Sequence, residues 1–215
     1  MQVKPIIIKL TAIAVILSIS AYVVSTVYLA QLNEGYSHLR HFVSELGKPN
    51  MPLHDLLNFS LIAIGLSFWG MAYVLYRILG WSKFTTPGIT FLALFAGTIF
   101  FEGIFPCEGD CMNPSTLSGF IHGIVGLPAI VFSPLATIYL SKGMRNDGHF
   151  RDIWKVCYLL GILTAVAMLL AMTVFPYLDL MGLGQRIGVF FMFIVPIIYS
   201  IKLLSYYQYL ETKEI

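Results

Sequence analysis

The sequence predicts an all-α fold, an integral membrane bundle of six transmembrane helices that forms a single domain over residues 1–215. Hydrophobic residues make up 58% of the chain and charged residues only 11%, and the mean hydropathy is +0.81. These values lie far from those of an ordinary soluble domain. The apolar residues also gather into stretches long enough to cross a hydrocarbon core of about 30 Å, which takes roughly 20 residues of helix. Six stretches qualify, at 6–30, 53–78, 87–106, 117–141, 153–176 and 187–209.

The first stretch follows Lys4 and Lys9, so it resembles a secretion signal at first sight. Its uncharged run from Leu10 to Leu29 is longer than the 7–15 residues of a typical signal core. No clear small-residue cleavage motif follows it. We therefore expect this stretch to remain in the protein as a membrane span.

The later spans carry ordinary helix boundaries. Pro52 and Asp55 fit the first turn of the second span, where proline is tolerated and an acid meets the positive end of the helix dipole. Phe-Pro pairs close the third span at Phe105 and the fifth at Phe175, because proline cannot continue a helix. The connections are short, so we expect no soluble domain between spans.

The distribution of basic residues predicts the orientation. If the amino terminus is cytoplasmic, ten Lys and Arg residues fall on the cytoplasmic side and three, Arg40, Lys48 and Arg186, on the other. Six spans then place both termini in the cytoplasm. We expect a multi-pass protein of the cell membrane, the inner membrane in a bacterium. The net charge of +2 and the lack of a basic run indicate no nucleic-acid partner.

An unusually polar stretch, FEGIFPCEGDC at 101–111, closes the third span. Glu102 lies about one turn inside the membrane, where an ionisable group is costly and usually has a partner. His122 in the fourth span is the nearest candidate partner, and Arg186 at the start of the sixth is the candidate cation. These three residues could line a polar pocket that opens outward. Alternatively, Glu102 could form a structural ion pair or reach the membrane surface.

Cys107 and Cys111 are four residues apart, a spacing that can close a disulfide. The predicted orientation places them in the oxidising compartment of a bacterium, which favours a bridge. Free thiols are the first alternative, and a zinc site with Glu108, Asp110 or His122 is the second. Zinc sites generally use more cysteine or histidine pairs than this chain shows, so we predict no metal site.

The outer loop 37–47, SHLRHFVSELG, has apolar residues at helical spacing. It is expected to form an amphipathic helix that lies on the membrane or folds back over the bundle. Ser44 is a conceivable nucleophile, but no G-x-S-x-G motif surrounds it. The loop and its neighbours complete the set of candidate pocket residues. These additional candidates are Ser44, Glu45, Asp55, Asn58 and Asp110.

Glycines recur in the fourth span at Gly119, Gly123 and Gly126. This approximates a small-xxx-small pattern, which allows two membrane helices to approach closely. We expect these glycines to serve helix packing.

Several of these features together resemble the bacterial and archaeal membrane proteins grouped as domain of unknown function 998. The matching residues are SELG at 44–47, the helix around Asn58, GIFP followed by acids at 103–110, His122-Gly123, and GQR at 184–186. Their order covers nearly the whole chain. The resemblance implies a compact helical membrane protein of six or seven spans, and it implies no particular activity.

Three kinds of function fit the sequence. The first is an outward-facing pocket that binds or handles a lipid headgroup or a small polar ligand, in transport, sensing or a lipid-related role. The second is a membrane-embedded hydrolase acting on lipid. The third is an accessory or structural protein without chemistry. Membrane lipids are the expected partners and no cofactor is expected, because paired histidines that could ligate haem on facing spans are missing.

Overall fold

The computed structural model describes residues 3–109, 111 and 114–213, and within them the chain is helical with no strand. Six helices are long and apolar enough to cross a membrane, which confirms the predicted all-α membrane fold. They are α1 (Pro5–Leu32), α2 (Asp55–Leu79), α3 (Thr85–Ile104), α4 (Leu117–Met144), α5 (Trp154–Thr173) and α6 (Met181–Lys213). Two short 3₁₀ helices lie in the connections, η1 (Val43–Gly47) and η2 (Phe175–Leu178).

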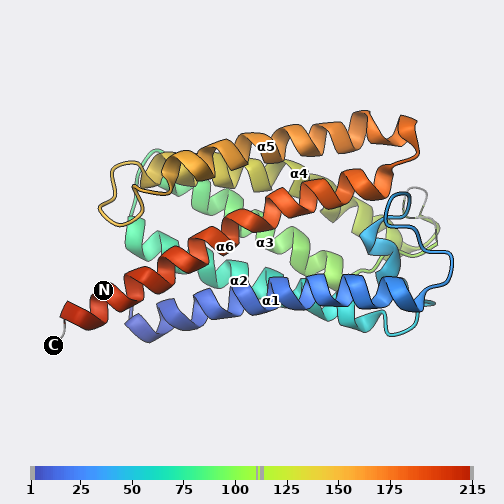
Figure 1. Ribbon diagram of the computed structural model, residues 1–215, viewed down its shortest axis with the longest axis horizontal. Coiled ribbons are helices and arrows are strands. Elements are labelled where there is room, and N and C mark those ends of the chain that lie inside the picture. Colours follow the sequence, from blue (N-terminus) through green and yellow to red (C-terminus); the bar gives the residue numbers. More distant parts are fainter. Residues whose placement is uncertain (1–2, 110, 112–113, 214–215) are drawn as a thin grey trace.

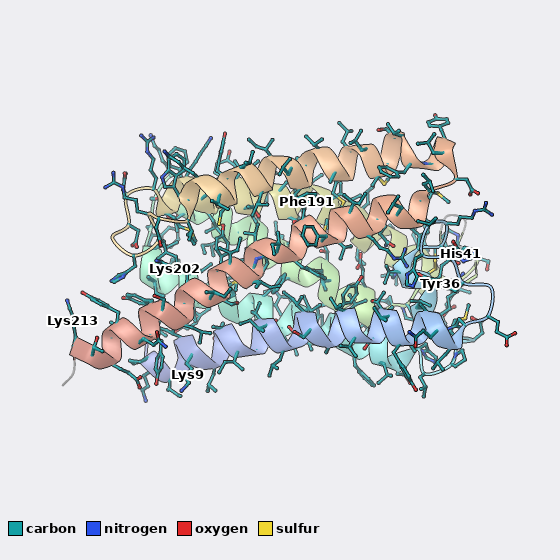
Figure 2. The ribbon with its side chains drawn as sticks, viewed as in Figure 1. Lys9, Tyr36, His41, Phe191, Lys202 and Lys213 are labelled. Carbon is teal, nitrogen blue, oxygen red and sulfur yellow. A yellow bond between two sulfur atoms is a disulfide. The ribbon has the colours of Figure 1, made fainter. Side chains whose placement is uncertain are left out.

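The helices form a closed ring. Each one packs against the next in chain order, and α6 returns to pack against α1. Both termini lie at the same end of the bundle, at the left of Figure 1. We call the opposite end, which carries the α1–α2, α3–α4 and α5–α6 connections, the loop end. Lys9, Lys202 and Lys213 lie toward the end with the termini, as Figure 2 shows.

Glycines allow the closest helix pairs to form. A Cβ atom at Gly103 in α3 would lie 2.6 Å from the main-chain oxygen of Asn58 in α2. A Cβ atom at Gly88 would lie 2.7 Å from the main-chain nitrogen of Leu140 in α4. Any larger residue at these two positions would push the helix axes apart, so the absence of a side chain sets the spacing from α2 to α4.

Aromatic side chains fill the centre of the ring. Phe68 from α2 lies against Phe95 from α3 and Phe193 from α6, with ring centroids 5.8 and 6.1 Å apart. Phe193 also meets Tyr22 from α1 edge to face, with centroids 5.3 Å apart. All four side chains are buried. This cluster joins four helices and closes the interior below the loop end.

The loop after α1 differs from the predicted helix over 37–47. Only Val43–Gly47 forms a short 3₁₀ helix, and Val43 and Leu46 are buried against the bundle, so the segment folds back over it. The guanidinium group of Arg186 donates hydrogen bonds to the main-chain oxygens of His38 and His41. Because a continuous helix would need such oxygens for its own ladder, these contacts favour turns over 37–42.

The sixth helix begins earlier than the predicted residue 187, at Met181. Asp179 turns the chain with a left-handed φ of 56°. Gly182 then passes directly beneath the loop, where a Cβ atom would collide with the main-chain oxygen of His41. The first turn of α6 is therefore inserted under the α1–α2 loop, and it carries Gln185 and Arg186 into the bundle.

Candidate functional site

A cavity of about 270 Å³ lies inside the bundle at the loop end. Every helix and η1 contribute to its wall, which is mostly apolar. Five described polar side chains interrupt this apolar lining. They are Tyr22, Ser44, Glu102, His122 and Gln185.

Glu102 lies in the last turn of α3 and is half-buried. Its carboxylate forms no ion pair with any residue in the described part of the chain. Gly126 on α4 gives it room, since a Cβ atom there would lie 2.7 Å from Glu102 Oε1. The glycine that we expected to serve helix packing therefore makes space for an acid in the cavity wall.

His122 lies in the second turn of α4 and is held by the end of α3. Its Nδ1 is 2.9 Å from the main-chain oxygen of Phe105. Because a carbonyl oxygen only accepts hydrogen bonds, Nδ1 carries the proton. In the neutral ring Nε2 then has a lone pair that no described residue occupies. The imidazole thus lines the cavity in one defined tautomer.

Arg186 does not line the cavity but holds the α1–α2 loop. One guanidinium nitrogen donates to the main-chain oxygens of His38, His41 and Gly182 at 2.7, 3.0 and 2.8 Å. The other donates to the Tyr36 hydroxyl. Tyr36 and His41 lie together at the loop end in Figure 2. Arg186 therefore acts as a clamp on the loop that roofs the cavity.

The Tyr36 hydroxyl connects Arg186 to the start of η1. It donates to the main-chain oxygen of Phe42 at 3.0 Å, which requires a protonated phenol. Partial burial raises the pKa of Tyr36 above its ordinary value, although Arg186 opposes the shift. The phenol is therefore protonated at neutral pH and can serve as the donor.

Ser44 and Glu45 have different surroundings although they are neighbours. Ser44 lines the cavity, and its Oγ lies 3.8 Å from Cys111 Sγ. No hydrogen bond joins Ser44 to His122 among the described residues. Glu45 turns away from the cavity, accepting from the Phe42 main-chain N–H at 3.0 Å and pairing with Lys48 at 3.0 Å. It stabilises the start of η1.

Asp55 and Asn58 lie at the start of α2 and do not line the cavity. Asp55 is exposed and pairs with the His54 ring at 3.3 Å. Asn58 is buried and donates to the main-chain oxygen of Gly47 at 3.0 Å, which fastens η1 to α2. Asp110, the remaining candidate, lies outside the described residues.

Cys107 and Cys111 are joined in a disulfide, as predicted, with their Cα atoms 5.4 Å apart. Cys107 is buried, and Cys111 is part of the cavity wall. The bridge therefore ties the α3–α4 connection against the cavity. Within the described part of the chain, no three His, Cys, Asp or Glu side chains gather where they could hold a metal ion.

Gln185 is a cavity residue that the sequence analysis named only within the GQR motif and not among the candidate pocket residues. Its Oε1 accepts from the main-chain N–H of Val43 at 2.6 Å, so it links α6 to η1 while it lines the cavity. The predicted sixth span began at residue 187, so residue 185 fell outside the predicted helix and the direction of its side chain could not be expected. The helical start at Met181 supplies that direction.

Comparison with known proteins identifies the family of the chain. No curated protein and no solved structure matches the chain. A family profile covers residues 15–202, which include part of α1, all of α2 to α5, and α6 as far as Lys202. All the residues described above as lining the cavity fall within this range. The chain therefore belongs to the family described as Protein of unknown function (DUF998).

Proposed function

We propose that the protein binds a small ligand in the loop-end cavity, as part of a transport, sensing or lipid-related role. The observation that carries this proposal is the pair of ionisable groups in the cavity wall. Glu102 and His122 line the same mostly apolar cavity. The Glu102 carboxylate has no ion-pair partner among the described residues.

An unpaired acid at membrane depth is costly and is generally functional. A structural acid would be expected to sit against a cation, as Asp152 does with Lys202 at 2.7 Å. The cations at the loop end have other partners. Arg186 donates to main-chain oxygens and to Tyr36, Arg40 pairs with Asp179, and Lys48 pairs with Glu45. The polar groups of the cavity are thus left for a ligand.

The size and position of the cavity fit this role. Its volume of about 270 Å³ is close to the lower end of the roughly 300–1,000 Å³ typical of small-molecule sites. In the orientation that the basic residues predict, the cavity faces away from the cytoplasm. The ligand would then come from the outer leaflet or from the space outside it.

A lipid hydrolase is supported less well. Ser44 and His122 line the same cavity, but a nucleophilic serine needs a base within hydrogen-bond reach. The Ser44 hydroxyl instead contacts Cys111 Sγ at 3.8 Å, and a disulfide sulfur is no base. We therefore propose binding rather than hydrolysis.

Native mass spectrometry of the purified protein tests the proposal. We expect a non-covalently bound molecule on the wild type, its occupancy reduced at least tenfold in Glu102→Gln. Glu34→Gln is the matched control because it makes the same change at an exposed acid at the loop end, and it should keep full occupancy. A wild type that carries no ligand and shows none when incubated with membrane lipid extract would favour the accessory role.

A further inference from the structure

The cavity has an opening between α4 and α5. Toward the termini these helices are in close contact, and a Cβ atom at Gly161 would lie 2.9 Å from Ile138 Cγ1. Toward the loop end they diverge, as Figure 1 shows. There the cavity-lining Leu127 of α4 is 58% exposed and Met172 of α5 is 52% exposed. Side chains that both line a cavity and lie on the surface mark its rim.

The seams on either side of this opening are closed. Between α5 and α6, a Cβ atom at Gly184 would lie 3.1 Å from Ala171 Cα, and one at Gly188 would collide with the Met168 side chain. Between α3 and α4, the His122 ring bonds the main-chain oxygen of Phe105 at 2.9 Å. The cavity is thus accessible sideways, through the α4–α5 seam.

This seam faces the bilayer. Leu127 is ten residues into α4, about 15 Å along the helix axis. Both helices meet the length and hydropathy expected of a membrane span. A molecule dissolved in the membrane can therefore reach the cavity without passing through water.

The charge of the cavity wall indicates which kind of ligand headgroup the cavity would bind. All 13 Lys and Arg residues of the chain lie within the described residues, and none lines the cavity. A phosphate or carboxylate head would meet the Glu102 carboxylate with no cation to balance it. An ammonium head would instead neutralise the acid that lacks a partner.

The aromatic lining adds to this preference. Tyr22, Phe95 and Phe193 form part of the wall, and Phe42 covers it from the loop. The faces of aromatic rings attract ammonium groups, by about 0.5–2 kcal/mol for each favourable contact. Apart from the polar side chains named above, glycines and Cys111, the remaining wall is aliphatic or Met, which suits an apolar chain.

We infer that the ligand is a cationic amphiphile, with a protonated or quaternary amine head at Glu102 and an apolar chain that leaves between α4 and α5. This inference rests on the proposed function, because it assigns the ligand class of the same cavity. It also assigns the α4–α5 seam as the route by which the ligand enters from the bilayer.

Three ten-carbon probes test the headgroup: decyltrimethylammonium, decanoate and decanol, each added to the protein in maltoside micelles. We expect the ammonium probe to raise the unfolding temperature saturably and to bind at least tenfold tighter than the other two. Glu102→Gln should remove that preference, whereas Glu34→Gln should retain it. Equal or tighter binding of decanoate would overturn the assignment of a cationic head.

A bulky residue at the rim tests the route. Gly123 lines the cavity, and a Cβ atom there meets nothing within 4 Å. Gly123→Phe should therefore fold normally and slow the association of radiolabelled decyltrimethylammonium at least tenfold. Ile124→Phe is the matched control, because Ile124 is the next residue, is 54% exposed and is not part of the cavity wall. Equal association rates in both variants would overturn the lateral route.

The outcomes separate this inference from the proposed function. If the cavity-filling variant Ala129→Phe binds the ammonium probe as tightly as the wild type, the ligand does not occupy the cavity and both proposals fail. A second outcome is that the three probes bind equally to the wild type and that Ala129→Phe loses all of this binding. The cavity is then a binding site, and only the assignment of a cationic head fails.

Discussion

Two charged residues at the loop end have opposite environments. Arg186 makes four hydrogen bonds, three of them to main-chain oxygens, whereas Glu102 has no cationic partner among the described residues and faces a cavity. Hydrogen bonds to a charged group stabilise a fold by about 1.5–3 kcal/mol each when the alternative is an unsatisfied buried partner. Arg186 therefore contributes to folding, whereas Glu102 is the residue to which we assign the proposed binding role.

Substitution of Arg186 tests its contribution to stability. We expect Arg186→Ala to lower the free energy of unfolding by about 3 kcal/mol, because main-chain oxygens of the loop and Tyr36 lose their donor together. Arg40→Ala, the control, removes an exposed pair with Asp179 and should cost about 1 kcal/mol or less. Denaturation in detergent measures both. Equal stability of the two variants would contradict the clamp.

The disulfide between Cys107 and Cys111 also contributes to the stability of the loop end. It closes a loop between positions 107 and 111, and the chain-entropy relation for so short a loop gives about 2 kcal/mol. We expect Cys107→Ser with Cys111→Ser to lower stability by at most this amount. Alkylation of the unfolded wild type should modify one thiol, Cys157, before reduction and three after it. Three reactive thiols without reductant would show that the bridge is absent.

Among the elements, α4 changes its packing along its length. Its half toward the termini contacts α3 and α5 closely, at Leu140 and Ile138, while its half toward the loop end borders the cavity and the α4–α5 opening. Gly123 and Gly126 lie in this second half, where one meets open space and the other meets the Glu102 carboxylate. Small residues thus create volume there instead of bringing two helices together.

Two alanines two turns apart on α4 should respond differently to enlargement. Ala129 lines the cavity of about 270 Å³, and Ala136 borders a space of only about 10 Å³. We expect Ala129→Phe to leave the unfolding temperature unchanged or raised, because the ring fills empty volume. Ala136→Phe should cost about 1–3 kcal/mol through overpacking. Thermal unfolding of both variants measures this difference. Equal destabilisation would argue against empty volume beside Ala129.

At the scale of the molecule, the ring of six helices determines which end carries the site. An even number of spans brings the termini together, and Figure 1 shows them at one end with the connecting loops that roof the cavity at the other. The basic residues predict that the termini are cytoplasmic. The cavity end then faces outward.

Reporter fusions test this orientation. We expect a fluorescent protein fused after residue 215 to be active in the cytoplasm and an alkaline phosphatase fused at the same point to be inactive. A phosphatase inserted between Gly35 and Tyr36, in the α1–α2 loop, should be active. The reverse pattern would show that the cavity faces the cytoplasm.

The sequence predicted the spans well and the site in part. Hydropathy is a local property, so the centres of all six helices could be located. Helix ends were less accurate, as the start of α6 shows, because they depend on what the terminal turns contact. Glu102 and His122 do line one cavity, a result favoured by their places near the ends of adjacent spans. Arg186 was grouped with them only because it lies toward the same side of the membrane. That position does not give the direction of its side chain.

The sequence by itself determined the all-α membrane fold and the number of spans, and it favoured a disulfide between the close cysteines, because each depends on residues near one another in the chain. The tertiary structure decided which polar groups meet. Arg186 contacts Tyr36 across 150 residues, and Gln185 contacts Val43 across 142, since ring closure brings α6 beside the loop after α1. The same closure, with the divergence of α4 and α5, leaves the cavity that holds Glu102, and no local pattern encodes the angle between two helices.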